Sequence, residues 1–112
     1  MKIYHNPRCS KSRETLQLIR NHGVEPEIVE YLKEVPTTAE LKDILMKLNL
    51  KAEEIIRKGE PYYKENLKGK SFGEEEWIQI MIENPKLIER PIVVKNNKAV
   101  LGRPPESVEE FF

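Results

Sequence analysis

The sequence predicts an α/β fold in which a small mixed four-stranded sheet is flanked by helices and an all-helical insertion occupies the middle of the chain. Three observations support this prediction. A strand–helix–strand pattern opens the chain, only helical patterns follow in the middle, and a hairpin with a final helix closes it. The chain has 112 residues, a length that suits a single domain. We therefore expect residues 1–112 to form one domain.

The opening unit begins with a short strand over Lys2–His5, which ends at Asn6-Pro7. A helix is expected from Ser10 to the Asn21-His22-Gly23 stop, because apolar or small residues recur at helical spacing and glycine can adopt the left-handed conformation that ends a helix. A second strand follows Pro26, and its apolar and aromatic residues are Ile28, Val29, Tyr31 and Leu32. A strand–helix–strand unit of this length normally forms a parallel pair through a right-handed crossover.

The middle of the chain carries the signals of several helices. Thr37 and Glu40 have the spacing of a capping box, and the apolar stripe that follows is Leu41, Ile44, Leu45 and Leu48. Shorter helical patterns cover residues 51–56 and 62–67. A longer pattern covers residues 74–83, before Asn84-Pro85 ends it.

The last part of the chain predicts a hairpin and a helix. Residues 92–94 and 99–101 are apolar and flank an Asn96-Asn97 turn. The next two prolines, at 104 and 105, suit the first turn of a final helix over residues 106–112. The complete order of strands and helices is that of a thioredoxin-like fold.

Composition excludes several kinds of partner. The chain has 19 basic and 19 acidic residues, so no overall charge favours nucleic acid or an anionic membrane. No apolar run reaches the roughly 18 residues of a membrane-spanning helix, and the first residues lack the apolar core of a signal peptide. The single cysteine cannot form an internal disulfide, and a lone thiol suits a reducing compartment. We expect a cytoplasmic protein with no nucleic-acid or membrane partner.

The only cysteine, Cys9, lies where the first strand should turn into a helix. The first backbone N–H groups of a helix are unpaired and carry the positive end of the helix dipole, so this position favours a thiolate over a thiol. Arg8, Lys11 and Arg13 add positive charge, and no acidic residue precedes Glu14. The residue is therefore a candidate nucleophile in an anion-attracting region. The alternative is a small buried side chain that serves only in packing.

Cys9 and Ser12 form a Cys-x-x-Ser arrangement, in which a hydroxyl stands where a dithiol oxidoreductase has its second cysteine. Ser12 can hydrogen-bond the thiolate, or it can be an ordinary first-turn serine that binds the backbone. His5, four residues before the cysteine, can order the loop or influence the thiolate, or it can be a surface or capping residue. Without a second thiol, an adduct on Cys9 needs electrons from a thiol outside the chain.

Three arginines each lie next to a predicted chain breaker, namely Arg57, Arg90 and Arg103. Loops at the ends of strands should converge on the edge of the sheet that carries the Cys9 loop. Guanidinium groups bind tetrahedral oxyanions in bidentate fashion, so the three arginines together predict an oxyanion pocket. Taken singly, each could instead be a solvated surface charge, paired for example with Glu89 or Glu106.

These motifs are similar to those of the arsenate reductase family that uses glutathione and glutaredoxin, above all its short bacterial members. The resemblance extends from Lys2 to about Val108. It rests on Tyr4-His5-Asn6-Pro7-Arg8-Cys9-Ser10-Lys11-Ser12-Arg13, on Arg57 followed by Tyr62, on Asn84-Pro85-Lys86-Leu87-Ile88-Glu89-Arg90-Pro91-Ile92, and on Gly102-Arg103-Pro104-Pro105. It implies a thioredoxin-like fold, Cys9 as the catalytic nucleophile, and the three arginines as the oxyanion site.

The resemblance also implies a reaction. Arsenate, or a similar oxyanion, is reduced to arsenite through a covalent cysteine–arsenic adduct on Cys9, with glutathione as co-substrate, glutaredoxin as partner, and no metal or bound cofactor. Two alternatives are a redox-responsive regulator that binds RNA polymerase and a general glutathione-dependent thiol transferase. The regulator's switch is a Cys-x-x-Cys pair, whose second thiol is replaced here by Ser12. The transferase has no evident use for three clustered arginines.

Overall fold

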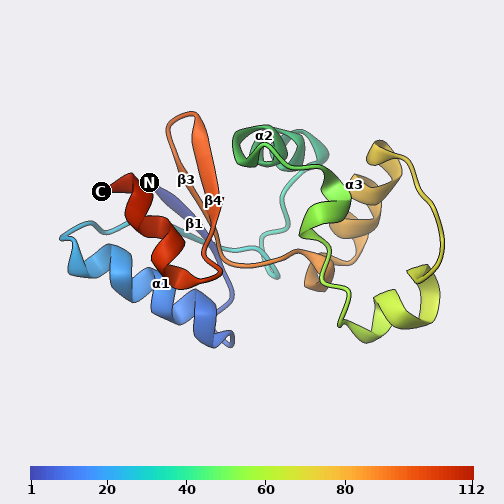
Figure 1. The fold of residues 1–112 in the computed structure, drawn as a ribbon, viewed down its shortest axis with the longest axis horizontal. Helices are drawn as coiled ribbons and strands as arrows, with labels where there is room; N and C mark the ends of the chain where they lie inside the picture. Colours follow the sequence, from blue (N-terminus) through green and yellow to red (C-terminus); the bar gives the residue numbers. More distant parts are fainter. The chain divides into compact units, whose positions relative to one another are not determined.

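Four short strands form one mixed sheet in the computed structural model, which describes all residues 1–112 (Figure 1). The strands are β1 (Lys2–His5), β2 (Glu27–Glu30), β3 (Ile92–Lys95) and β4 (Lys98–Leu101), in the order β2-β1-β3-β4. β1 and β2 are parallel, whereas β3 is antiparallel to both β1 and β4. The sheet confirms the predicted fold class, with its parallel opening unit and its C-terminal hairpin.

The second strand is shorter than its apolar pattern predicted. It ends at Glu30, and Tyr31 and Leu32 lie in a turn. The Glu30 carbonyl accepts the N–H groups of Lys33 and Glu34, both at 2.9 Å, so the backbone reverses before the strand can continue. Tyr31 is nevertheless buried. The aromatic side chain of Tyr31 is therefore buried from a turn, and it is not part of a strand.

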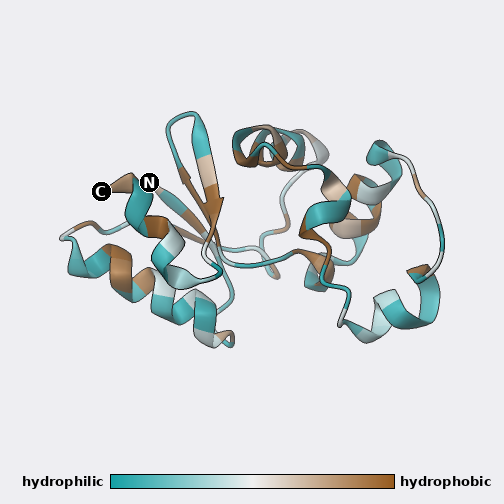
Figure 2. Ribbon diagram, in the orientation of Figure 1, coloured by the Kyte–Doolittle hydropathy of each residue, from teal (hydrophilic) through white to brown (hydrophobic).

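The chain divides into two compact units, Met1–Glu34 with Arg90–Phe112 and Val35–Glu89. The first unit holds the sheet, α1 (Ser10–Asn21) and the 3-10 helix η4 (Pro105–Phe111). α1 and η4 pack against each other and against the strands, and their shared core is Ile3, Leu16, Ile19, Val93, Val100 and Val108. Figure 2 shows that the hairpin of β3 and β4 is apolar at its base, near this core, and polar at its tip.

The two helices of this unit follow the predicted boundaries closely. Gly23, just after α1, has a φ of 79°, the left-handed conformation expected at a helix stop. The final helix differs in type, because η4 is a 3-10 helix. Its end is fastened to α1 by His22, whose Nε2 lies 2.8 Å from Glu109 Oε2 and whose ring stacks on Phe112 at 3.9 Å.

The second unit is helical throughout, which confirms the predicted insertion. Its elements are α2 (Thr38–Leu48), the 3-10 helix η1 (Ala52–Ile55), the π-helical turn η2 (Tyr63–Leu67), α3 (Glu74–Glu83) and the 3-10 helix η3 (Pro85–Leu87). α3 packs against α2, η1 and η3. The predicted capping box is present, because Thr37 Oγ1 accepts the Glu40 N–H at 3.1 Å and the Glu40 carboxylate accepts the Thr37 N–H at 3.0 Å. None of the helices is both long and apolar enough to cross a bilayer.

One isolated β-bridge joins Ile56 to Ile88 within the helical unit. The Arg57 N–H donates to the Leu87 carbonyl and the Glu89 N–H donates to the Ile55 carbonyl, each at 2.8 Å. These bonds hold two extended segments together. They bring the side chains of Arg57 and Glu89, far apart in the sequence, within reach of each other.

Candidate active site

Cys9 occupies the N-cap of α1, as its place in the sequence predicted. Its backbone is extended (φ −96°, ψ 123°), and its carbonyl accepts the Arg13 N–H at 3.0 Å. The Cys9 N–H donates to the Asn6 carbonyl, also at 3.0 Å, which closes a tight turn after β1. The thiol is partly exposed. It therefore lies beside the unpaired N–H groups of the first helical turn, where a negative charge is stabilised.

A buried polar cluster of His5, Asn6 and Ser12 holds this turn in place. Ser12 Oγ lies 2.6 Å from His5 Nδ1 and accepts the Asn6 N–H at 3.1 Å. The hydroxyl thereby ties the end of β1 to the first turn of α1. The hydrogen bonds of the Ser12 hydroxyl join it to these two groups rather than to Cys9. A hydrogen bond from Ser12 to a Cys9 thiolate therefore stays a prediction.

The pKa of His5 lies below its ordinary value of 6.5. Burial is the largest cause, because it removes the charged imidazolium from water. Glu30 opposes this effect by attraction, whereas Arg20 and Arg13 add to it by repulsion. His5 is consequently neutral at pH 7, and it orders the loop as an uncharged hydrogen-bonding group.

The basic residues around Cys9 have different local roles. Arg13 Nη1 donates to the Pro7 carbonyl at 3.0 Å, which braces the loop that leads to the cysteine. Lys11 Nζ lies 3.8 Å from Glu14 Oε2, in an exposed pair one helical turn apart. Such surface pairs are weak. The support that Lys11 and Arg13 give to a thiolate therefore stays a prediction.

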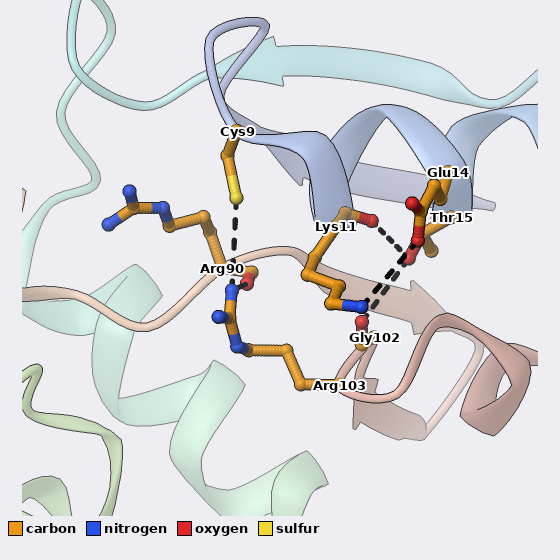
Figure 3. A network of polar contacts seen from close by, with 7 residues as sticks. All are labelled: Cys9, Lys11, Glu14, Thr15, Arg90, Gly102 and Arg103. Carbon is orange, nitrogen blue, oxygen red and sulfur yellow. Dashed lines mark hydrogen bonds and ion pairs between the residues drawn. The ribbon is translucent and has the colours of Figure 1, made fainter.

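Arg103 reaches Cys9 directly, as Figure 3 shows: its Nη1 lies 3.7 Å from the Cys9 sulfur. The same nitrogen donates to the Arg90 carbonyl at 3.0 Å. In Figure 3 the Arg90 side chain extends away from this carbonyl. The peptide bonds from Arg90 to Pro91 and from Arg103 to Pro104 are both cis. The structure thus brings the predicted nucleophile and one predicted arginine into contact.

Arg57 belongs to the helical unit and is paired with two carboxylates there. Its Nη1 lies 3.0 Å from Glu60 Oε2, and its Nε lies 3.5 Å from Glu89 Oε1. All three side chains are about one-quarter exposed. Pairing with Glu89 was the alternative that the sequence left open for these arginines. The part of Arg57 in binding an oxyanion stays a prediction.

Sequence reasoning missed two groups near these residues. Thr15 and Gly102 meet between α1 and the end of β4, with Thr15 Oγ1 at 3.3 Å from the Gly102 carbonyl. The available signal was a glycine between a strand and an Arg-Pro pair, but the sequence does not show which residue contacts that glycine. Glu60 is the other carboxylate paired with Arg57, and the only signal for this ion pair in the sequence was that Glu60 follows Arg57 by three residues.

Comparison with known proteins finds relatives that match nearly the whole chain. The model of the ArsC family matches residues 4–111. An arsenate reductase from Neisseria meningitidis is 43% identical over 111 residues, which cover 97% of this chain and 95% of that protein. The Escherichia coli protein named "Uncharacterized protein YfgD" is 57% identical over 113 residues, 99% of this chain and 95% of its own.

A solved structure gives the same result for the fold. The arsenate reductase from Vibrio cholerae has a TM-score of 0.94 and 46% identity, and the match covers 100% of this chain and 98% of that one. A family model that spans nearly the whole sequence, together with relatives of matching length, shows that the chain belongs to the ArsC family.

Proposed function

We propose that the chain reduces arsenate to arsenite with Cys9 as the nucleophile. The observation that carries the proposal is the position of this sulfur, at the start of α1 and 3.7 Å from Arg103 Nη1. A thiol beside a guanidinium and a helix N-terminus suits attack on a tetrahedral oxyanion. Relatives that bear the name arsenate reductase support the choice of oxyanion.

In the first step, the Cys9 thiolate attacks arsenic. An S–As bond forms, an As–O bond breaks, and the departing oxygen leaves as water after it is protonated from solvent. Arsenic remains pentavalent in this adduct. Arg103, together with the first N–H groups of α1, stabilises the oxyanion charge during the attack. Arg57 and Arg90 stay predicted members of the same oxyanion site.

In the second stage, external thiols supply the two electrons. Glutathione displaces a second oxygen from arsenic, again as water. A glutaredoxin thiolate then attacks the glutathione sulfur, the bond from that sulfur to arsenic breaks, and its electron pair stays on arsenic, which becomes trivalent. The products are a mixed disulfide of glutathione and glutaredoxin and, after hydrolysis, arsenite and free Cys9. This role for external thiols is proposed because Cys9 is the only cysteine of the chain.

The proposal assigns no resident metal or cofactor to the reaction. It places the protein in the cytoplasm, where the glutathione and glutaredoxin systems keep thiols reduced. Its substrate is arsenate, and its partners are glutathione and glutaredoxin.

The test is arsenate-dependent NADPH consumption in the presence of glutathione, glutathione reductase and glutaredoxin. Wild type should consume NADPH, whereas Cys9→Ser should not. Ser10→Ala is the matched control, because it changes the exposed neighbouring residue and should keep the wild-type rate. Equal rates for wild type and Cys9→Ser would refute the proposal. Turnover of a small disulfide, without turnover of arsenate, would identify a thiol transferase instead.

A further inference from the structure

Thr15 lies on α1, fully buried, on the side that meets the end of β4. Its hydroxyl is 2.8 Å from the Lys11 carbonyl in its own helix and 3.3 Å from the Gly102 carbonyl. Both carbonyl oxygens lie within hydrogen-bond distance of this one hydroxyl, and the Lys11 carbonyl is the nearer of the two. Figure 3 shows Thr15 between the two carbonyls. This side chain thus bonds the helix that begins after Cys9 to the backbone that precedes Arg103.

Gly102 is packed against Thr15 without room for a side chain. A Cβ atom at this position would lie 2.5 Å from Thr15 Oγ1 and 2.6 Å from Pro91 Cγ. The Gly102 N–H also donates to the Pro91 carbonyl at 2.9 Å. The end of β4 is therefore held on two sides, by the helix and by the segment that leads into β3.

Arg103 follows Gly102 directly, and its guanidinium is held at two points. Nη1 donates to the Arg90 carbonyl at 3.0 Å and lies 3.7 Å from the Cys9 sulfur. Both ends of this sulfur–guanidinium contact are thus connected to Thr15. Cys9 is connected through the first turns of α1, and Arg103 is connected through Gly102.

We propose that Thr15 is a positioning residue that acts through Gly102 to hold the Arg103 guanidinium beside the Cys9 sulfur. The inference deepens the proposed function and rests on it, since it concerns the same nucleophile and its cationic neighbour. A buried threonine that merely satisfies its own helix would need only the Lys11 carbonyl. The second carbonyl and the absence of space at Gly102 distinguish Thr15 from that ordinary case.

The test measures the position of Arg103 without arsenate. Cys9, as the only thiol, is alkylated with iodoacetate, which is anionic, and with iodoacetamide, which is neutral, and the ratio of the two rate constants is determined. A guanidinium next to the sulfur attracts the carboxylate, so Arg103→Ala should lower the ratio about two- to fivefold, the range expected for an exposed ion pair. Thr15→Val keeps the shape of the side chain without its hydroxyl, and it should lower the ratio to a similar degree.

Two controls make the test specific. Thr15→Ser retains the hydroxyl and should keep the wild-type ratio, and Thr38→Val makes the same chemical change in α2 and should also leave it unaltered. The double variant Thr15→Val/Arg103→Ala should show no further fall beyond Arg103→Ala alone. A wild-type ratio in Thr15→Val, or falls that multiply in the double variant, would overturn the proposal. If Thr15→Val melts below the assay temperature, all variants are compared at a lower temperature at which Thr15→Val is folded, under the same criteria.

The alkylation ratio separates this inference from the proposed function. If arsenate is not reduced but the ratio falls in Thr15→Val, the positioning role stands and the proposed substrate is wrong. If arsenate is reduced, Thr15→Val should also lower kcat/KM by about tenfold, because misplacement of a charge-stabilising group by a fraction of an ångström weakens transition-state binding. An unchanged ratio with normal arsenate reduction overturns the positioning role alone.

Discussion

Replacing Gly102 with alanine should displace the segment after β4 that carries Arg103. The new Cβ would lie 2.5 Å from Thr15 Oγ1 and 2.6 Å from Pro91 Cγ. Nonbonded heavy-atom contacts are optimal at about 3.5–4.0 Å, so relief of both contacts requires a movement of roughly 1 Å. Neither neighbour can yield freely. Thr15 is buried and bonded to the Lys11 carbonyl, and Pro91 is a buried ring next to β3.

The expected cost follows from two opposing effects. Overpacking a filled site costs about 1–3 kcal/mol, whereas the reduced freedom of the unfolded chain returns about 0.4–1 kcal/mol when glycine becomes alanine. At the midpoints of these ranges the net loss in free energy of unfolding is about 1.3 kcal/mol. In thermal denaturation followed by circular dichroism, this corresponds to a fall in Tm of roughly 4–8 °C for each kcal/mol.

Gly59→Ala is the matched control for this substitution. Nothing lies within 4 Å of a Cβ built at Gly59. The control should therefore melt at the wild-type temperature or slightly above it. A wild-type Tm for Gly102→Ala, or an equal loss of stability in both alanine variants, would refute the predicted clash at Gly102.

Two further predictions concern pH and anion affinity. Because the pKa of His5 is lowered in the folded protein, the unfolded chain binds the proton more tightly, so the free energy of unfolding should decline as the pH falls below about 6.5. Urea denaturation between about pH 5 and 8 should show a smaller decline for His5→Asn, and an equal decline would contradict the assignment. The proposed function includes Arg57 in arsenate binding, and on that proposal Glu60→Gln, which removes a carboxylate 3.0 Å from Arg57, should lower KM for arsenate about two- to fivefold. A raised KM would show that Glu60 orients Arg57 rather than competes with the anion.

The ends of helices were predictable where a residue of restricted or unusual backbone conformation, a glycine or a proline, marks them. The helix stop at Gly23 and the break at Asn84-Pro85 are of this kind, because backbone conformation alone determines both. β2 was predicted too long because Tyr31 follows its apolar residues. In a sequence, an aromatic residue that is buried in a turn cannot be distinguished from one that belongs to a strand. The final helix was predicted without its type, and it is the 3-10 helix η4, which packs against α1.

The place of Cys9 in the fold could be predicted from the sequence, but its contacts could not. Cys9 at the first helical turn follows from local sequence, since the strand, the Asn-Pro turn and the helix are all adjacent to it. Its contact with Arg103 joins residues 94 positions apart, and the contact of Thr15 with Gly102 joins residues 87 positions apart. Only the assembled sheet determines such distances. The partners of Ser12 were open for the same reason, because its hydroxyl can choose among several nearby groups.

The buried state of Ser12 bears on how the proposed reaction could be completed. A resolving group at this position must be free to approach the Cys9 sulfur after an adduct forms. Ser12 is fully buried, and its oxygen contacts both His5 Nδ1 and the Asn6 N–H. Ser12 therefore cannot act as a resolving residue, because it carries no thiol and its side chain is held in place by these contacts. Cys9 is partly exposed, so on the proposed mechanism an external thiol can approach the sulfur from solvent, whereas Ser12 is held by the buried cluster.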